Sequence, residues 1–336
     1  MLAGTALVLL LLLDEAAPFS LLPPPGAMLR PQLSCNTPTG RMRPGPGVRG
    51  VGMLLLRNDV YVAAGRSGWA VGVALGAGAI SFAESKRQTD MIKSCRNVGQ
   101  LAEIVSEYVE RFSHVNVNTA WLSMARLPAG TQDKELSVAL QNCTRKLLGK
   151  MEGRHLANLL HSAATLHVAG RARADDELVQ QLASRSLEVL RTQPGSFDSQ
   201  GVAITMWALG KLGARVDQEL ATAMQRQAIE IADDFNEQGV SNLLWGLATL
   251  GVEVDPQLVT VMQNRAIEIA DEFNSQGVSN LLWALAKLGM GVYPALAKAM
   301  KRRAIEIANT FKPQEVSNLM WGLATLGVEV DPQLVT

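Results

Sequence analysis

The chain has 336 residues, of which 48% are hydrophobic, and its 31 basic side chains balance its 31 acidic ones. This composition is sufficient for a continuous core, which excludes a disordered, highly charged polypeptide. The three cysteines, Cys35, Cys95 and Cys143, are odd in number and far apart, which argues against a disulfide framework or a zinc motif and favours a reducing compartment.

Charge is distributed unevenly along the chain. Residues 1–99 contain 10 basic and 5 acidic side chains, whereas residues 100–336 contain 21 basic and 26 acidic ones, a net charge of −5. Nucleic-acid-binding domains are usually basic. An RNA site in the second region would therefore need a locally basic groove.

The first 58 residues resemble a bipartite targeting presequence. Residues 2–13 form an apolar run of signal-peptide length, and residues 16–58 contain arginines but no acidic side chain among many prolines and glycines. This order is similar to the leaders of algae with secondary plastids, and Phe19 resembles the phenylalanine at their junction. We expect a plastid protein, with the mitochondrion as the alternative.

Residues 59–97 are expected to be a linker that contains a second apolar run, residues 69–83. This run fits three interpretations: a stop-transfer segment of the presequence, a buried segment before the folded domain, or a membrane span. A span needs about 20 apolar residues, and this run is shorter and interrupted by glycine. We expect no stable membrane span in the mature protein.

Residues 98–336 contain a 38-residue repeat. The stretch Phe273–Gly289 (FNSQGVSNLLWALAKLG) recurs almost unchanged at Phe235–Gly251 and Phe311–Gly327, and more loosely at Phe197–Gly213. The tryptophans of these copies are Trp207, Trp245, Trp283 and Trp321, and degenerate copies place Trp121 and His161 at the same position. A period of this length predicts an all-α solenoid of paired-helix repeats, with about six units.

Each unit is expected to contain two helices. The first runs from about Ser275 to Leu288 in the clearest copy, with Asn274 or Ser275 as its N-cap and Gly289 as its C-terminal stop. The second runs from about Pro256 to Asp271, with Asp255 as its N-cap. The segment Val328–Thr336 repeats the beginning of such a second helix and then ends without a polar cap, so we expect the natural protein to be longer.

A polar strip is predicted on the first helix of each unit. At 100° per residue its leucines face the second helix, whereas Ser, Asn, Trp and the residue one turn after Trp lie on the opposite side. Tryptophan can stack on RNA bases and asparagine can bond base edges; alternatively, both residues hold neighbouring repeats together. The candidate RNA-binding residues are Lys211, Asn242, Trp245, Thr249, Asn280, Trp283, Lys287, Asn318, Trp321 and Thr325.

Within this strip, the position one turn after Trp is the best candidate for base specificity. It varies between lysine and threonine from unit to unit, whereas Trp and Asn hardly vary. A second candidate site is a basic cluster on a second helix, Lys298, Lys301, Arg302 and Arg303. The alternative for that cluster is a solvated helix face.

Over residues 100–336 the unit with NLLWALAKLG in its first helix resembles the octotricopeptide repeat family of organellar RNA-binding proteins, and also the helical repeats of FAST-kinase-like, RAP-domain proteins. The resemblance implies a paired-helix superhelix and a role in organellar RNA metabolism, as for chloroplast translation factors of that family. The Pro-Pro-Pro-Glu-Trp box of many family repeats is absent, and so is a RAP-type domain. A nuclease activity is therefore not implied.

The function predicted from the sequence is sequence-specific binding of single-stranded RNA in organellar post-transcriptional control: RNA stability, processing, splicing or translation. The expected partners are that RNA and proteins of an RNA-processing or translation complex. The alternative is a protein-binding scaffold of the armadillo or HEAT type. We expect no enzyme, cofactor, metal or small-molecule substrate, because the four histidines lack metal-ligand spacing and no phosphate-binding glycine loop is evident.

Overall fold

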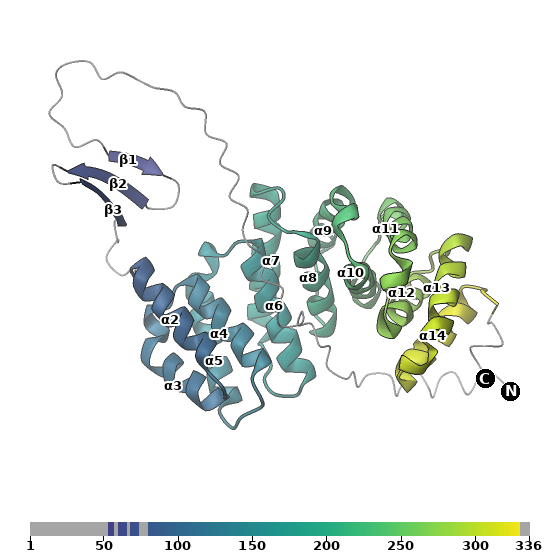
Figure 1. Cartoon of the computed structure of the whole chain (residues 1–336), viewed down its shortest axis with the longest axis horizontal. Coiled ribbons are helices and arrows are strands. Elements are labelled where there is room, and N and C mark those ends of the chain that lie inside the picture. The colour runs from purple at the N-terminus through teal and green to yellow at the C-terminus, as the bar shows by residue number, and fades with distance from the viewer. Residues whose placement is uncertain (1–52, 57–59, 66–67, 74–79, 330–336) are drawn as a thin grey trace, which may run out of the picture. The chain divides into compact units, whose positions relative to one another are not determined.

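The computed structural model describes the backbone of residues 53–56, 60–65, 68–73 and 80–329, and the side chains of residues 80–329 (Figure 1). Most of the predicted presequence lies outside the described residues. The second helix expected from Asp331 onward lies outside them as well.

A small antiparallel sheet precedes the helices and was not predicted. Its strands are β1 (Met53–Leu56), β2 (Val60–Gly65) and β3 (Gly68–Val73), in the order β1-β2-β3. Leu54 pairs with Val62, and Val62 pairs with Val71. Of the second apolar run of the sequence, residues 69–73 belong to β3 and residues 82–83 to the first helix, and residues 74–79 lie outside the described residues. Among the described residues, every helix is too short or too polar to cross a membrane.

The rest of the described chain is an all-α solenoid, as predicted. The first helices of its units, called A helices, are α4 (His114–Arg126), α6 (Gly153–Val168), α8 (Ser199–Lys211), α10 (Glu237–Leu250), α12 (Ser275–Lys287) and α14 (Pro313–Thr325). The second helices, called B helices, are α5 (Asp133–Leu147), α7 (Asp176–Thr192), α9 (Gln218–Glu230), α11 (Pro256–Glu268) and α13 (Pro294–Glu306). Each A helix packs against the A helices before and after it, and the later B helices pack likewise in a second layer (Figure 1).

The solenoid begins before residue 98, where the sequence analysis placed its start. Helix α2 (Phe82–Ser94) comes before that start, whereas α3 (Val98–Tyr108) lies within the predicted solenoid and packs on α4 and α5. On α4, the Asn116 amide donates to the Ser85 carbonyl at 2.7 Å and to the Thr89 hydroxyl at 2.9 Å. These bonds tie α2 to α4.

The helix ends follow the local sequence. Asn274 accepts a hydrogen bond from the Gly277 N–H at 2.8 Å, and Asp255 accepts one from the Gln257 N–H at 2.8 Å, so both are N-caps as predicted. Gly289 has φ +66°, the left-handed conformation that ends helices and favours glycine. Short 3-10 turns follow α3 and most B helices: η1 (Val109–Arg111), η2 (Leu148–Lys150), η3 (Ala232–Asp234), η4 (Ala270–Glu272) and η5 (Ala308–Thr310).

Polar side chains of the B helices fasten each unit to its neighbours. The buried Gln263 amide donates to the Gly291 carbonyl at 3.1 Å and accepts from the Tyr293 N–H at 2.8 Å. Gln141 and Gln225 make the same pair of bonds to the turns of their following units. These bonds satisfy backbone groups that the turns would otherwise leave unpaired. They also set the spacing of the units.

The A helices are packed through small residues that alternate along the chain. The residue after Trp is Ala208, Gly246, Ala284 and Gly322 in successive units. A Cβ atom at Gly246 would lie 2.5 Å from the backbone carbon of Met206, and one at Gly322 would lie 2.9 Å from that of Leu282. Glycine is therefore required where α10 crosses α8 and where α14 crosses α12.

We expect Gly246→Ala to lower the free energy of unfolding by about 1–3 kcal/mol, because its methyl group would overlap the backbone of α8. Alanine is the better helix former, so any loss must come from this overlap. Gly210→Ala is the matched control: its Cβ would first meet the end of a side chain, at 3.3 Å, and other units have alanine there. Denaturant unfolding of both variants measures the difference. Equal stability of the two would contradict the close crossing.

Candidate functional site

The repeated tryptophans differ in exposure although their motifs are nearly identical. Trp121 and Trp207 are buried, with 1% and 2% of their surfaces exposed. Trp245 and Trp283 are partly exposed, and Trp321 is 37% exposed. The surface-accessible aromatic row is thus confined to α10, α12 and α14. We call these three tryptophans, with Thr249, Lys287 and Thr325 one turn after them, the tryptophan strip.

The rings of the tryptophan strip contact one another. The ring centroids of Trp245 and Trp283 are 6.3 Å apart with an interplanar angle of 30°, and those of Trp283 and Trp321 are 6.2 Å apart at 41°. Aromatic pairs attract each other at these separations. Lys211 places its ammonium 4.2 Å from the centroid of the Trp245 ring, as a cation–π contact. The strip is therefore a pre-ordered aromatic row with a cation at its N-terminal end.

The serines of the predicted polar strip hold neighbouring repeats together. The Ser279 hydroxyl donates to the Glu315 carbonyl on α14 at 2.8 Å and is fully buried. The Ser241 hydroxyl contacts the Gly277 carbonyl on α12 at 3.2 Å. These serines therefore join neighbouring A helices and are not available at the surface.

The asparagines lie deeper than a surface row would require. Asn242 is 2% exposed and Asn280 is also buried, whereas Asn318, on the last described helix, is partly exposed. The Oδ1 atom of Asn242 is buried and has no hydrogen-bond partner among the described residues. In this structure Asn242 and Asn280 lie beneath the tryptophan strip, and direct base contacts would need them to become accessible.

The position one turn after Trp reaches the surface in the later units. Thr249, Lys287 and Thr325 are exposed, and Lys211 is partly exposed. The Thr249 hydroxyl donates to the Trp245 carbonyl of its own helix at 2.8 Å. This threonine therefore offers only acceptor lone pairs to a ligand, whereas the exposed Lys287 offers only donors.

The basic cluster on α13 is engaged with neighbouring units. Arg303 donates to the Phe273 carbonyl at 2.8 Å, Lys301 to the Glu329 carbonyl at 3.3 Å, and Arg302 pairs with Asp271. Lys298 is exposed. Three of the four cations thus fasten units together, so the predicted basic patch is largely a structural element.

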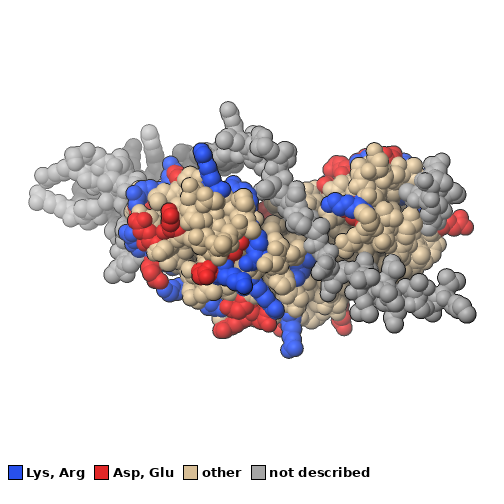
Figure 2. All heavy atoms as spheres, turned by 90° about the horizontal axis from the view of Figure 1, so that it is seen from below, with Lys and Arg blue, Asp and Glu red and all other residues tan. Residues whose placement is uncertain are grey.

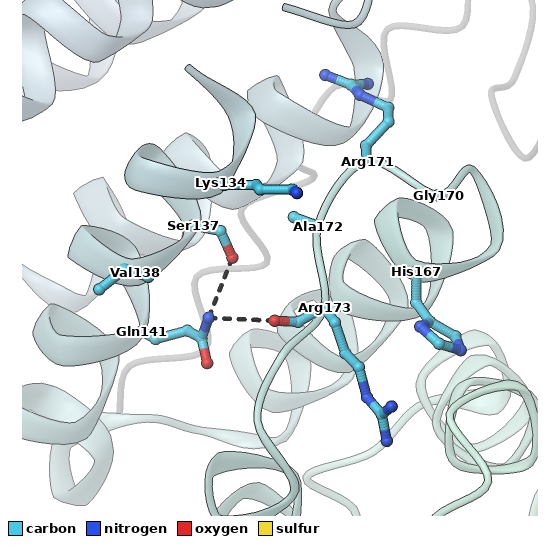
Figure 3. Close-up of a pocket in the computed structure, with 9 residues that line it drawn as sticks. All are labelled: Lys134, Ser137, Val138, Gln141, His167, Gly170, Arg171, Ala172 and Arg173. Carbon is cyan, nitrogen blue, oxygen red and sulfur yellow. Dashed lines mark hydrogen bonds between the residues drawn. The ribbon is translucent and has the colours of Figure 1, made fainter. Parts of the chain in front are cut away.

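The visible face in Figure 2 mixes basic and acidic side chains, with no continuous basic stripe. A pocket of about 460 Å³ lies between α5 and the turn from α6 to α7, where the side chains of Lys134, Ser137 and Gln141 face the 171–173 segment (Figure 3). Its Arg171 is paired with the buried Asp133 at 2.9 Å. This pocket lies on a B helix and includes no residue of the tryptophan strip. Within residues 80–329, no group of three or more His, Cys, Asp or Glu side chains is arranged to hold a metal ion.

A comparison with protein families matches residues 89–293, more than half of the chain, to the RNA-editing substrate-binding complex 6 protein. The chain belongs to the RNA-editing substrate-binding complex 6 family. No curated protein matches the chain. Membership of this family makes the chain an RNA-associated helical-repeat protein, the class that the sequence resemblance implied. The match does not identify the chain specifically as an octotricopeptide repeat protein.

The region matched to the RNA-editing substrate-binding complex 6 family includes most of a glutamine row that the sequence analysis missed. The row lies two turns before each tryptophan, at Gln200, Gln238, Gln276 and Gln314. Gln238, Gln276 and Gln314 are partly exposed, and no partner for their amides appears among the described residues. Their separation of seven residues from Trp, about 20° on the helix, was the signal available from sequence.

The same family region contains His161, which replaces Trp in α6. Its ring lies 5.4 Å from that of Trp207, and its Nε2 atom is buried without a partner among the described residues. Burial lowers the pKa of His161 to about 4. Burial also lowers the pKa values of His114 and His155, whose rings meet at 4.9 Å. These histidines are therefore neutral in the folded protein at neutral pH.

We expect the free energy of unfolding to fall on acidification. The His161 ring binds a proton near pH 6.5 in the unfolded chain but only near pH 4 in the folded protein. Protonation therefore favours the unfolded chain, and the stability present above pH 6.5 is lost progressively as the pH falls toward 4. This interval corresponds to up to about 3 kcal/mol. His161→Phe should reduce the loss, and denaturant unfolding at pH 7 and pH 5 measures it. An unchanged pH dependence in the variant would show that other groups cause it.

Proposed function

We propose that the chain binds single-stranded RNA through the tryptophan strip. The observation that carries the proposal is the row of contacting, partly exposed rings on α10, α12 and α14. Aromatic platforms of this kind bind successive bases with about 1–3 kcal/mol per stacked base. Membership of the RNA-editing substrate-binding complex 6 family supports an RNA ligand and a protein complex around it.

The position one turn after Trp is the proposed source of base specificity, in the manner of helical repeats that read one base per unit. Its members are Lys211, Thr249, Lys287 and Thr325. The neighbouring Asn318 is accessible enough to contribute at the last described unit. This arrangement would make the chain an octotricopeptide-like binding protein rather than an enzyme.

The proposed setting is an organelle, a plastid with the mitochondrion as the alternative, and the proposed process is post-transcriptional control of organellar RNA. The support is the presequence-like composition of residues 1–58. A reporter fused to residues 1–97 tests this setting. An organellar reporter supports it, and a cytosolic reporter contradicts it.

Binding of labelled single-stranded RNA at several salt concentrations tests the function. Because Lys211 and Lys287 are proposed to read bases, few phosphates are neutralised, and the slope of log K against log salt should be no steeper than about −1 to −2, the value for two phosphate contacts. This small slope fits the net charge of −5 of residues 100–336, because stacking rather than charge would supply most of the affinity. If single strands fail to bind at low salt, the protein-scaffold alternative is favoured, and a duplex control separates stacking from charge attraction.

A further inference from the structure

We infer that the repeat units work in pairs, and that the strip together with Lys211 prefers single-stranded RNA with guanine at every second position. This inference rests on the proposed function and specifies its ligand. The four units from α8 to α14 carry it.

Two positions of the repeat alternate together. Units with alanine after Trp have lysine one turn later, and units with glycine after Trp have threonine there. The alanine–lysine units are α8 (Ala208, Lys211) and α12 (Ala284, Lys287), and the glycine–threonine units are α10 (Gly246, Thr249) and α14 (Gly322, Thr325). The true period of this surface is therefore two units.

The packing of the A helices requires the two glycines of this alternation. Only a residue without a side chain fits at Gly246 and Gly322, because a Cβ would lie 2.5 Å or 2.9 Å from the backbone of the preceding A helix. Helix α10 is thereby held against α8, and α14 against α12. Alanine occupies the same position where α12 follows α10. We refer to the helices that meet at these two glycine crossings, α8–α10 and α12–α14, as close pairs.

Within the first close pair the lysine and the tryptophan meet. The Lys211 ammonium, from the end of α8, lies 4.2 Å from the centroid of the Trp245 ring on α10. In sequence, Lys287 at the end of α12 corresponds to Lys211, and Trp321 of α14 corresponds to Trp245. Each pair therefore presents one lysine from its first helix and one tryptophan ring from its second. The ammonium covers part of that ring, so a base that stacks there has to displace it from the ring face and would then lie next to it.

The chemistry of the two side chains predicts different base preferences. A lysine ammonium has only donors, and guanine is the base with two neighbouring acceptors, O6 and N7, on one edge. Adenine offers N7 beside an amino donor, so it fits less well. The Thr249 hydroxyl already donates to the Trp245 carbonyl, and threonine accepts several bases. With one base per unit, guanine is favoured opposite α8 and α12 and any base is accepted opposite α10 and α14.

Labelled octanucleotides (GU)4, (AU)4 and (GGUU)2 test the inference against wild type and the charge-neutral swap Thr249→Lys/Lys287→Thr. Wild type should bind (GU)4 about tenfold more tightly than (AU)4, the lower part of the range for one bidentate pair. The swap places lysines on two adjacent units, so it should prefer (GGUU)2 to (GU)4. Both changed residues are exposed, and a melting curve confirms that the swap remains folded.

The outcomes separate this inference from the proposed function. Equal binding of (GU)4 and (AU)4 by wild type, or an unchanged preference in the swap, would overturn the inferred guanine preference at every second position. Either result would leave the proposal of RNA binding intact. Loss of binding to every octanucleotide already in wild type would overturn both. A preference of wild type for (AU)4 would also reject the inference.

Discussion

Replacing Trp207 with alanine is expected to lower the free energy of unfolding by about 3–5 kcal/mol, the cost of a large cavity in a packed core. Trp207 is 2% exposed and its ring packs beside His161. Trp321→Ala is the matched variant, because it removes the same side chain from the same motif position. Trp321 is 37% exposed and contacts one neighbouring ring, so we expect a loss of about 1–2 kcal/mol.

Denaturant unfolding of both variants, with the unfolding slope compared to wild type, measures this difference. The slope matters because repeat arrays can lose cooperativity, and a single free energy then loses its meaning. Equal losses at the two positions would contradict the gradient of exposure along the solenoid. That gradient is what restricts the proposed RNA site to α10, α12 and α14.

The double variant Trp283→Ala/Trp321→Ala is expected to bind single-stranded RNA about 10- to 100-fold more weakly than wild type. Each ring would contribute about 1–3 kcal/mol as a stacking surface, and the two contributions are not additive because the rings touch each other at 6.2 Å. The slope of affinity against salt should stay the same, because no charge is removed.

Fluorescence anisotropy with one labelled RNA at two salt concentrations measures both quantities. Trp283→Phe/Trp321→Phe is the control, since it keeps an aromatic face at each position and should retain most of the affinity. Wild-type affinity in the alanine variant would remove the tryptophan strip from the site. A steeper or shallower salt slope would indicate that the variant has changed the path of the RNA backbone.

Much of the fold was predictable because its signals are local and repeated. Asp255 before Pro256 and Gly289 after the leucine-rich helix mark helix ends in almost the same way in several units. Helix α12 was expected at Ser275–Leu288 and is found at Ser275–Lys287. The B helix α11 ends at Glu268 because its last expected turn becomes the 3-10 turn η4.

Helix α2 and the strands were missed because they do not contain the repeated motif. Helix α2 has no tryptophan and begins inside a glycine-rich apolar run, which resembles a targeting segment more than a repeat. Its connection to α4 depends on the side chain of Asn116, a contact that no periodicity reveals.

The site was predicted only in part because a helical wheel describes one helix at a time. Ser279 and Trp283 lie about 40° apart on the wheel, yet Ser279 is fully buried and bonds α14 while Trp283 reaches the surface. Which residues of the polar strip are covered by the neighbouring repeat depends on the step from one A helix to the next, that is, on how closely the two helices approach. The close crossings at Gly246 and Gly322 govern that step, and their need for glycine is visible only when the helices are placed side by side.

Crosslinking of bound RNA to the full chain, followed by mass spectrometry of the linked peptides, tests the central claim most directly. A photoreactive single-stranded RNA should link to peptides that contain Trp245, Trp283 or Trp321, and excess unlabelled RNA should abolish these links. Links confined to the B helices, such as the Lys298–Arg303 segment of α13, would contradict the account. In that case the tryptophan row would serve only to pack the repeats together.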